Sequence, residues 1–222
     1  METAFHFLQS GLFTIPDSNT INVKSSRALL MVAKWLQEYM TWQWADDGLL
    51  EPSMPRPKAK PHHVMILIGP AGTGKTSVLK AAEALIDHFA GPESVRKCAI
   101  SNAAARILRG DTLHSLCRLP MTDKHKVTSR LTSKTLRKHR LRWKTAVSVF
   151  VDEISMVSPD QLHQTDVRTR QAKQQPDNLF GGLLTILAGD FLQLPPVSKL
   201  TLATKIDDAG FTKKKSCVHL SG

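Results

Sequence analysis

The segment GPAGTGKT, residues 69–76, places one lysine among three glycines and ends on a threonine. It matches the pattern G-x-x-x-x-G-K-[ST], in which glycines let backbone N–H groups turn inward around phosphate oxygens. Lys75 is then expected beside the β- and γ-phosphates of a nucleoside triphosphate, and the Thr76 hydroxyl is expected to ligate Mg²⁺. The predicted cofactor-binding residues are Gly69, Pro70, Ala71, Gly72, Thr73, Gly74, Lys75 and Thr76.

The surroundings of this segment favour the phosphate interpretation. An apolar run at 64–68 precedes it, and a helical pattern with one apolar face follows it and ends near Gly91. The start of that helix would add its positive dipole end and its unpaired N–H donors to the site. The alternative is a glycine turn with a surface lysine; a random chain of this length matches the pattern in roughly one case per hundred.

Hydrolysis of a triphosphate also needs a carboxylate that holds the metal and a group that orients water. The segment VSVFVDE offers both, because Asp152 and Glu153 follow an apolar run, at the edge where ligands of parallel sheets gather. We expect Asp152 to hold Mg²⁺ and Glu153 to act as general base toward water. Gln193, in the segment LAGDFLQLPPV, could hydrogen-bond the γ-phosphate. The alternatives are a solvated strand end for the two acids and an ordinary polar turn for Gln193.

Apolar runs alternate with helical patterns along the chain, which indicates an α/β fold of the P-loop NTPase type, with a parallel sheet flanked by helices. We expect the unbroken apolar run at 64–68 to be a strand buried on both faces. Further strands are predicted at 96–101, 147–153 and 183–190, and helices at 24–44, 102–110 and 159–175, besides the helix that follows the phosphate loop.

Composition limits the class of protein. The chain has 222 residues and a formal net charge of +11, which suits a polyanion such as nucleic acid, although a soluble protein that is merely basic is the alternative. Its three cysteines, at 98, 117 and 217, are too far apart to predict a zinc site or a disulfide framework, and Cys98 is expected in a buried strand. No apolar run approaches the roughly 20 residues that cross a bilayer, so we expect no membrane association. The start carries no secretory signal pattern, and we expect an intracellular protein, in the nucleus rather than the mitochondrion.

A basic stretch at 123–144 contains nine lysine or arginine residues. One interpretation is that it follows a phosphate backbone, with Trp143 available for stacking on a base. The other is a helix that packs Leu136 and Trp143 inward and leaves its charges in solvent. We expect Trp143 to be packed inward, and we leave both interpretations open for the charges.

The segments GPAGTGKT, GDTLHS, VDEISMV and GDFLQLPPV, in this order, resemble superfamily 1 DNA helicases of the petite integration frequency (PIF) type, which include the helicase parts of Helitron transposons. The resemblance covers about residues 21–198. It implies a RecA-like first motor domain, use of ATP and Mg²⁺, and 5′-to-3′ movement along single-stranded DNA in repair, recombination or telomere maintenance. By position, Gly72, Gly74, Lys75 and Thr76 correspond to motif I of the family, Asp152 and Glu153 to motif II, and Gln193 to motif III.

The resemblance also implies residues that contact DNA. The segment AISNAAARI is similar to motif Ia of the family, with Ser101 in place of its threonine, so that Ser101 and Asn102 would touch the DNA backbone. Thr112 and His114 fall in the T-x-H-S element near the DNA path, where His114 could equally support the site without touching DNA. One departure concerns Ser25, which stands where the family has a glutamine that reads adenine. A hydroxyl cannot offer the paired donor and acceptor of an amide, so adenine selectivity is in doubt.

The sequence divides into an N-terminal helical segment at 1–50, a proline-rich linker at 51–62, a RecA-like motor domain at 63–198 and a basic tail at 199–222. The tail carries no second RecA-like domain, so we expect a chain that binds ATP, hydrolyses it slowly and does not unwind DNA alone. Two other functions remain open: an ATP-gated module that binds DNA or a partner without turnover, and an AAA-type ATPase. A fragment or an inactive remnant is also compatible, and the oligomeric state is not predicted.

Overall fold

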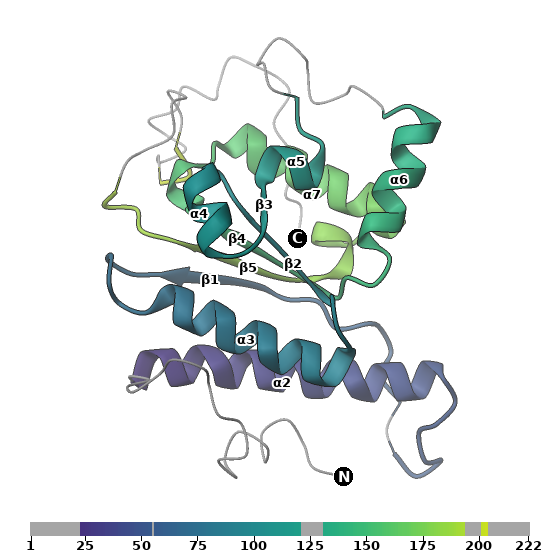
Figure 1. Ribbon diagram of the computed structural model, residues 1–222. Coiled ribbons are helices and arrows are strands. Elements are labelled where there is room, and N and C mark those ends of the chain that lie inside the picture. Colours follow the sequence, from purple (N-terminus) through teal and green to yellow (C-terminus); the bar gives the residue numbers. More distant parts are fainter. Residues whose placement is uncertain (1–22, 55, 121–130, 194–200, 204–222) are drawn as a thin grey trace, which may run out of the picture.

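The computed structural model describes residues 23–54, 56–120, 131–193 and 201–203. Its centre is a sheet of five strands in the order β1-β5-β4-β2-β3, and every neighbouring pair is parallel (Figure 1). The strands are β1 (Val64–Ile68), β2 (Val95–Ala99), β3 (Asp111–Thr112), β4 (Ser148–Asp152) and β5 (Leu184–Gly189). The predicted parallel α/β fold is confirmed.

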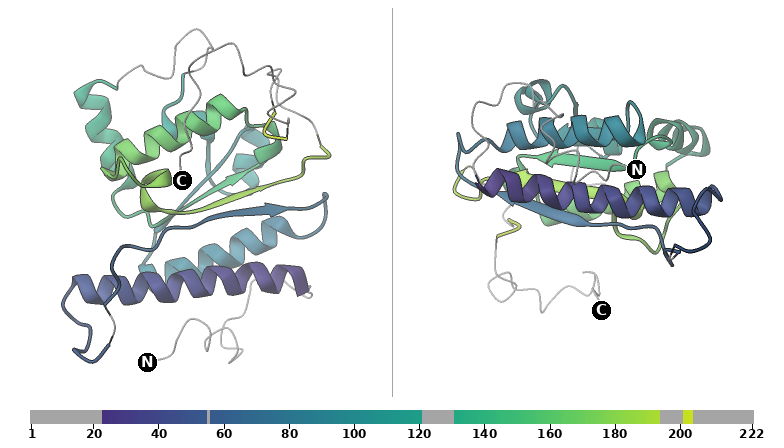
Figure 2. Two further views of the ribbon diagram at one scale, coloured as in Figure 1. Left: turned by 180° about the vertical axis from the view of Figure 1, so that it is seen from behind. Right: turned by 90° about the horizontal axis from the view of Figure 1, so that it is seen from below.

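Helices cover both faces of this sheet. α2 and α3 run side by side below it, and α5, α6 and α7 lie above it, an arrangement that the view from behind shows again (Figures 1 and 2). The elements are α2 (Val23–Asp46), α3 (Lys75–Ala90), α4 (Asn102–Ile107), α5 (Leu113–Cys117), α6 (Ser133–Trp143), α7 (Pro159–Lys173) and two 3₁₀ turns, η1 (Ile154–Met156) and η2 (Leu179–Gly182). Within these described elements, no helix combines the length and the apolarity that a bilayer span requires.

The two faces of the sheet build two hydrophobic clusters, because successive side chains of a strand point to opposite faces. Phe150 and Ile186 pack with α2 and α3, whereas Val149, Val151 and Leu187 pack with α5 and the end of α6. Cys98 is buried in the second cluster, as predicted. The buried strands therefore hold their carboxyl ends in fixed relative positions at one edge of the sheet.

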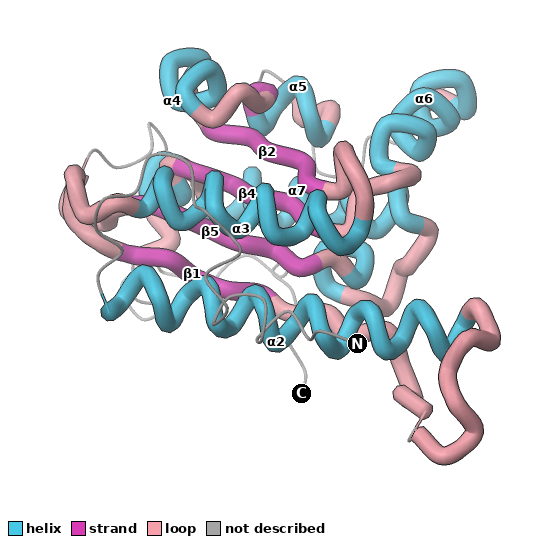
Figure 3. The backbone as a smooth tube through the Cα atoms, turned by 60° about the horizontal axis from the view of Figure 1, so that its bottom comes forward, coloured by secondary structure: helices cyan, strands magenta, loops and turns pink. Residues whose placement is uncertain are grey.

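The prediction that β1 is buried on both faces is wrong. Met65 is buried toward α2 and α3, but on the opposite face Val64 is 42% exposed, Ile66 59% and Ile68 57%. Among the described strands β1 pairs only with β5, so it forms the margin of the sheet (Figure 3). An unbroken apolar run indicates a strand in such a sheet, but it does not tell which strands have two neighbours.

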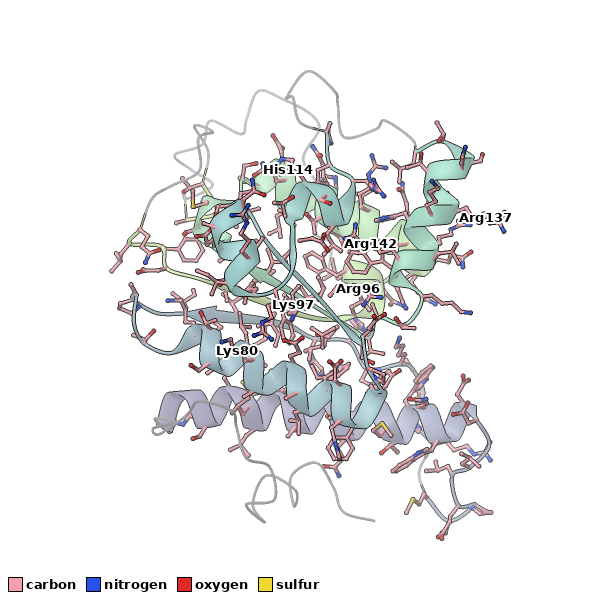
Figure 4. The ribbon with its side chains drawn as sticks, in the orientation of Figure 1. Lys80, Arg96, Lys97, His114, Arg137 and Arg142 are labelled. Atoms are coloured by element: carbon pink, nitrogen blue, oxygen red, sulfur yellow. The ribbon has the colours of Figure 1, made fainter. Side chains whose placement is uncertain are left out.

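The described part of the basic stretch, from residue 131 on, contains α6, which buries Trp143 completely, as predicted; residues 123–130 lie outside the described residues. Leu136 is only half-buried, and the second residue that α6 buries completely is His139. Figure 4 shows Arg137 pointing outward from the opposite side of this helix. Arg137 of α6 thus lies on an outer face of the molecule, while one imidazole and one indole anchor the helix.

Candidate functional site

The phosphate loop joins the end of β1 to the start of α3. Gly72 and Gly74 have φ angles of 77° and 85°, in the left-handed region that side chains disfavour, so glycine is needed at both positions. The Gly69 N–H donates to the carbonyl of Gly189 at 3.2 Å, which ties the loop to the end of β5. The Thr73 hydroxyl donates to the Pro70 carbonyl at 2.8 Å and closes the turn.

Lys75 lies within this loop rather than in solvent. Its Nζ atom donates to the carbonyl oxygen of Gly69 at 2.6 Å and to that of Pro70 at 2.8 Å. Both acceptors belong to the loop that precedes the lysine, so the ammonium group stays beside the turned backbone. The positive charge is thereby held where phosphate oxygens would enter.

A cavity of about 390 Å³ lies at the carboxyl ends of the strands and adjoins this loop. It is lined by residues from the phosphate loop, from α4 and from the ends of β4 and β5: Ala71, Gly72, Gly74, Lys75, Thr76, Ala104, Ile107, Asp152, Glu153, Gly189, Asp190 and Gln193. The structure therefore brings the three predicted motifs together around one space. Gly69, Pro70 and Thr73 belong to the same loop but do not line the cavity.

The two acids occupy different environments within this cavity. Burial raises the pKa of Asp152 above its usual value; the neighbouring Glu153 carboxylate also raises it, whereas the N–H of Glu153, which donates to Oδ1 of Asp152 at 2.9 Å, and Lys75 oppose the shift. Glu153 has a φ of 57°, an unusual value for a residue with a side chain. Its Oε2 atom accepts a hydrogen bond of 2.7 Å from the Ser101 hydroxyl. Asp152 thus lies near Lys75 of the phosphate loop. Glu153 is held by Ser101, which belongs to the connection from β2 to α4.

The residues around Asp152 fit a hard divalent cation. The Asp152 carboxylate and the Thr76 hydroxyl line the same cavity and are oxygen donors of the kind that Mg²⁺ takes together with phosphate oxygens. A cation there would offset the burial that raises the pKa of Asp152. When bound, it would neutralise charge on the phosphates, while Lys75 and the loop N–H groups hold them.

None of the four residues predicted to contact DNA lines the cavity. Ser101 caps α4 by accepting from the Ala104 N–H at 3.2 Å, and Asn102 is exposed in the first turn of that helix. Thr112 caps α5 by accepting from the Ser115 N–H at 3.3 Å. Their roles toward DNA stay predictions, as does the consequence of Ser25, which lies in the first turn of α2.

His114 has a neighbour in the described structure. Its Nε2 atom lies 3.5 Å from Nε2 of Gln161 on α7. That contact connects α5 with α7 rather than with the cavity. Whether His114 meets DNA also stays a prediction.

Several basic residues have structural partners rather than an open position. Arg142 forms an ion pair with Asp111, and Arg96 donates to the Arg142 carbonyl at 2.8 Å. Lys97 pairs with Glu83 at 2.5 Å. Figure 4 shows Arg96 and Arg142 close together near the middle of the molecule, whereas Arg137 points outward.

Sequence reasoning missed one wall of the cavity, which α4 supplies through Ala104 and Ile107. The pattern NAAARI predicts the helix but not which of its sides faces the cavity. It also gave no role to Gly189. A Cβ atom there would lie 2.8 Å from Cγ2 of Ile154, so the end of β5 can pass the η1 turn only as glycine.

The chain is similar to proteins of one family. The family model of PIF1-like helicases matches residues 55–220. The ATP-dependent DNA helicase PIF1 of Saccharomyces cerevisiae is 36% identical over 141 residues, which are 62% of this chain and 16% of that protein. The ATP-dependent DNA helicase PIF1 of Xenopus laevis is 31% identical over 153 residues, 69% of this chain and 23% of that protein. The chain thus spans less than a quarter of either relative.

Solved structures agree with the fold described above. The crystal structure of Pif1 helicase from Candida albicans has a TM-score of 0.59 and 25% identity, and the match covers 82% of this chain and 35% of that one. The structure of Pif1 helicase from Bacteroides in complex with ADP-AlF3 and ssDNA has a TM-score of 0.54 at 25% identity, with the same 82% and 35% coverage. The match to these structures supports the predicted RecA-like character of the sheet.

Proposed function

The chain belongs to the PIF1-like helicase family, and we propose that it is the ATP-binding motor part of a DNA helicase, which hydrolyses ATP with Mg²⁺ and acts on single-stranded DNA. The observation that carries this proposal is the convergence of Lys75, Asp152 and Gln193 on one cavity from three separate strand ends. The family assignment displaces an AAA-type ATPase as the alternative. Movement from 5′ to 3′ and a nuclear location are part of the same proposal.

The proposed roles follow the chemistry of each group. The loop N–H groups and Lys75 hold the phosphates, and Thr76 with Asp152 holds the cation. Glu153 accepts the proton of the attacking water as general base. Gln193 hydrogen-bonds the γ-phosphate and so distinguishes ATP from its product. Single-stranded DNA passes near Ser101, Asn102, Thr112 and His114.

The test measures ATP binding and ATP turnover separately. Lys75→Ala should weaken binding, whereas Glu153→Gln should bind ATP as the wild type does and lose turnover by about 10² to 10⁴-fold. Lys80→Ala and Glu51→Gln change exposed residues of the same types and serve as matched controls, which should behave as the wild type. Binding is read by a fluorescent ATP analogue and turnover by phosphate release, with and without single-stranded DNA.

Two outcomes are decisive. If Lys75→Ala binds ATP as tightly as the Lys80→Ala control, the proposed nucleotide site is wrong. The second outcome is that the wild type binds ATP and single-stranded DNA but releases phosphate no faster than Glu153→Gln does. In that case an ATP-gated binding module replaces the motor as the proposed function.

A further inference from the structure

Ser101 makes two hydrogen bonds with one hydroxyl group. Its Oγ atom accepts from the Ala104 N–H at 3.2 Å, which caps α4, and it donates to Oε2 of Glu153 at 2.7 Å. The first bond is the usual task of a serine at the start of a helix. The second bond reaches Glu153, the proposed general base, which lies 52 positions further along the chain.

The register of the sheet explains this contact. β2 and β4 are neighbours, and Ala99 at the end of β2 is paired with Asp152 at the end of β4. Ser101 follows Ala99 by two residues and Glu153 follows Asp152 by one, so both connections leave the same edge of the sheet side by side. The meeting of the two side chains is therefore built into the strand pairing and does not depend on a long loop.

The contact restricts a side chain that would otherwise have many orientations. A glutamate has three side-chain torsions, and a general base must lie within hydrogen-bond reach of the proton that it removes. The left-handed backbone at Glu153 fixes where the side chain starts, and Ser101 fixes one carboxylate oxygen at its end. The other oxygen, Oε1, is left to meet water in the cavity that Glu153 lines.

We propose that Ser101 is a positioning residue for ATP hydrolysis, which orients the Glu153 carboxylate through this hydrogen bond. The inference rests on the proposed function, because it assigns Glu153 as the base. It gives Ser101 a task on the nucleotide side, in addition to the DNA contact predicted from sequence. It also links α4, whose Ala104 and Ile107 line the cavity, with the acid that acts in it.

Three substitutions separate the two hydrogen bonds of Ser101. Ser101→Ala removes both. Ser101→Asp retains a good helix cap but cannot donate while ionised, and it places a like charge beside Glu153. Ser101→Thr retains both the cap and the donor.

The expected pattern is a split between turnover and binding. Ser101→Ala and Ser101→Asp should lower kcat by about one to two orders of magnitude, the scale of a hydrogen bond to a charged group, while the KM for ATP changes by less than about threefold. Ser101→Thr should stay near wild-type kcat. If capping were the only task, Ser101→Asp would behave as the wild type, and that result would overturn the inference.

A second readout does not need turnover. In protein with ¹³C-labelled glutamate carboxyl groups, the Glu153 resonance is identified by its loss in Glu153→Gln. We expect this resonance to shift in Ser101→Ala and Ser101→Asp and to return near its wild-type position in Ser101→Thr. An unmoved resonance in all three would overturn the inference. If the resonance moves as expected while Glu153→Gln leaves turnover intact, the proposed function fails but the contact stands.

Discussion

Acidification should destabilise the folded protein through one buried imidazole, that of His139 on α6. The side chain is 0% exposed, and its Nε2 atom lies 3.1 Å from the carbonyl oxygen of Arg168. Since a carbonyl only accepts, Nε2 carries the proton, and Nδ1 is buried without a partner among the described residues. Burial lowers the pKa of His139 to about 4, because the charged imidazolium would lose its hydration there; the guanidinium groups of Arg168, Arg118 and Arg142 lower it further, and the hydrogen bond to the Arg168 carbonyl opposes the shift.

The magnitude follows from the difference between the folded and unfolded states. The unfolded imidazole has an ordinary pKa of 6.5, whereas the folded one has a pKa of about 4. Between these values the unfolded chain binds a proton that the native state does not bind, so the free energy of unfolding falls as the pH falls. At about pH 5 this linkage favours the unfolded state by roughly 30-fold, which is about 2 kcal/mol, and above about pH 7 it vanishes.

Urea unfolding followed by tryptophan fluorescence at about pH 7.5 and about pH 5.0 measures this loss. His139→Gln can still donate an amide N–H to the Arg168 carbonyl but does not titrate, and His62→Gln removes an exposed histidine as the matched control. We expect the wild type and His62→Gln to lose about 2 kcal/mol more than His139→Gln between the two pH values. Carboxylates contribute equally to all three proteins and cancel. Equal losses in the wild type and His139→Gln would refute the buried neutral imidazole.

Three further variants test other parts of the structure. Gly110→Ala should lower the free energy of unfolding by at least about 2 kcal/mol in the same urea assay, because the new Cβ would lie 2.4 Å from the Lys97 carbonyl oxygen. Gly189→Ala should lower the rate of ATP turnover by a larger proportion than the free energy of unfolding. Its Cβ would lie 2.8 Å from a methyl carbon of Ile154 in η1, the turn that follows the acid pair. Arg137→Glu combined with Arg140→Glu should weaken binding to an oligo-dT strand and flatten its salt dependence, measured by fluorescence anisotropy; an unchanged salt slope would exclude α6 from DNA binding.

Local chemistry made much of the geometry of the candidate site predictable. The phosphate loop needs glycine at two left-handed positions and a lysine beside the turn, and such requirements can be read within eight residues. The acids were predictable because they follow an apolar run that forms a strand. The carboxyl ends of parallel strands lie at the edge of the sheet where ligands bind. The segment around Gln193 was predictable only in combination with the other two, since a polar turn alone carries little information.

Other features could not be predicted because they depend on which strands and helices are neighbours. The exposure of Ile66 follows from the marginal position of β1, and an apolar run does not contain that information. The hydrogen bond between Ser101 and Glu153 requires β2 to pair with β4 in one particular register. His139 stands among basic residues that suggest solvent, yet the packing of α6 against α7 buries it.

The contacts of Lys75 determine how much free energy this residue can contribute to the proposed binding of a nucleotide. In the folded protein its ammonium group already donates to two backbone carbonyls, so its third N–H can bond to a phosphate oxygen directly, and any further bond to phosphate must replace one of these two. A bond to phosphate joins two opposite charges, whereas a bond to a carbonyl involves only the charge of the lysine, so the exchange is favourable. The net gain is nevertheless a difference between two sets of hydrogen bonds, not the full strength of one. Because Gly69, one of the two acceptors, is itself bonded to Gly189, the exchange can be made by one side chain while the loop backbone stays in place.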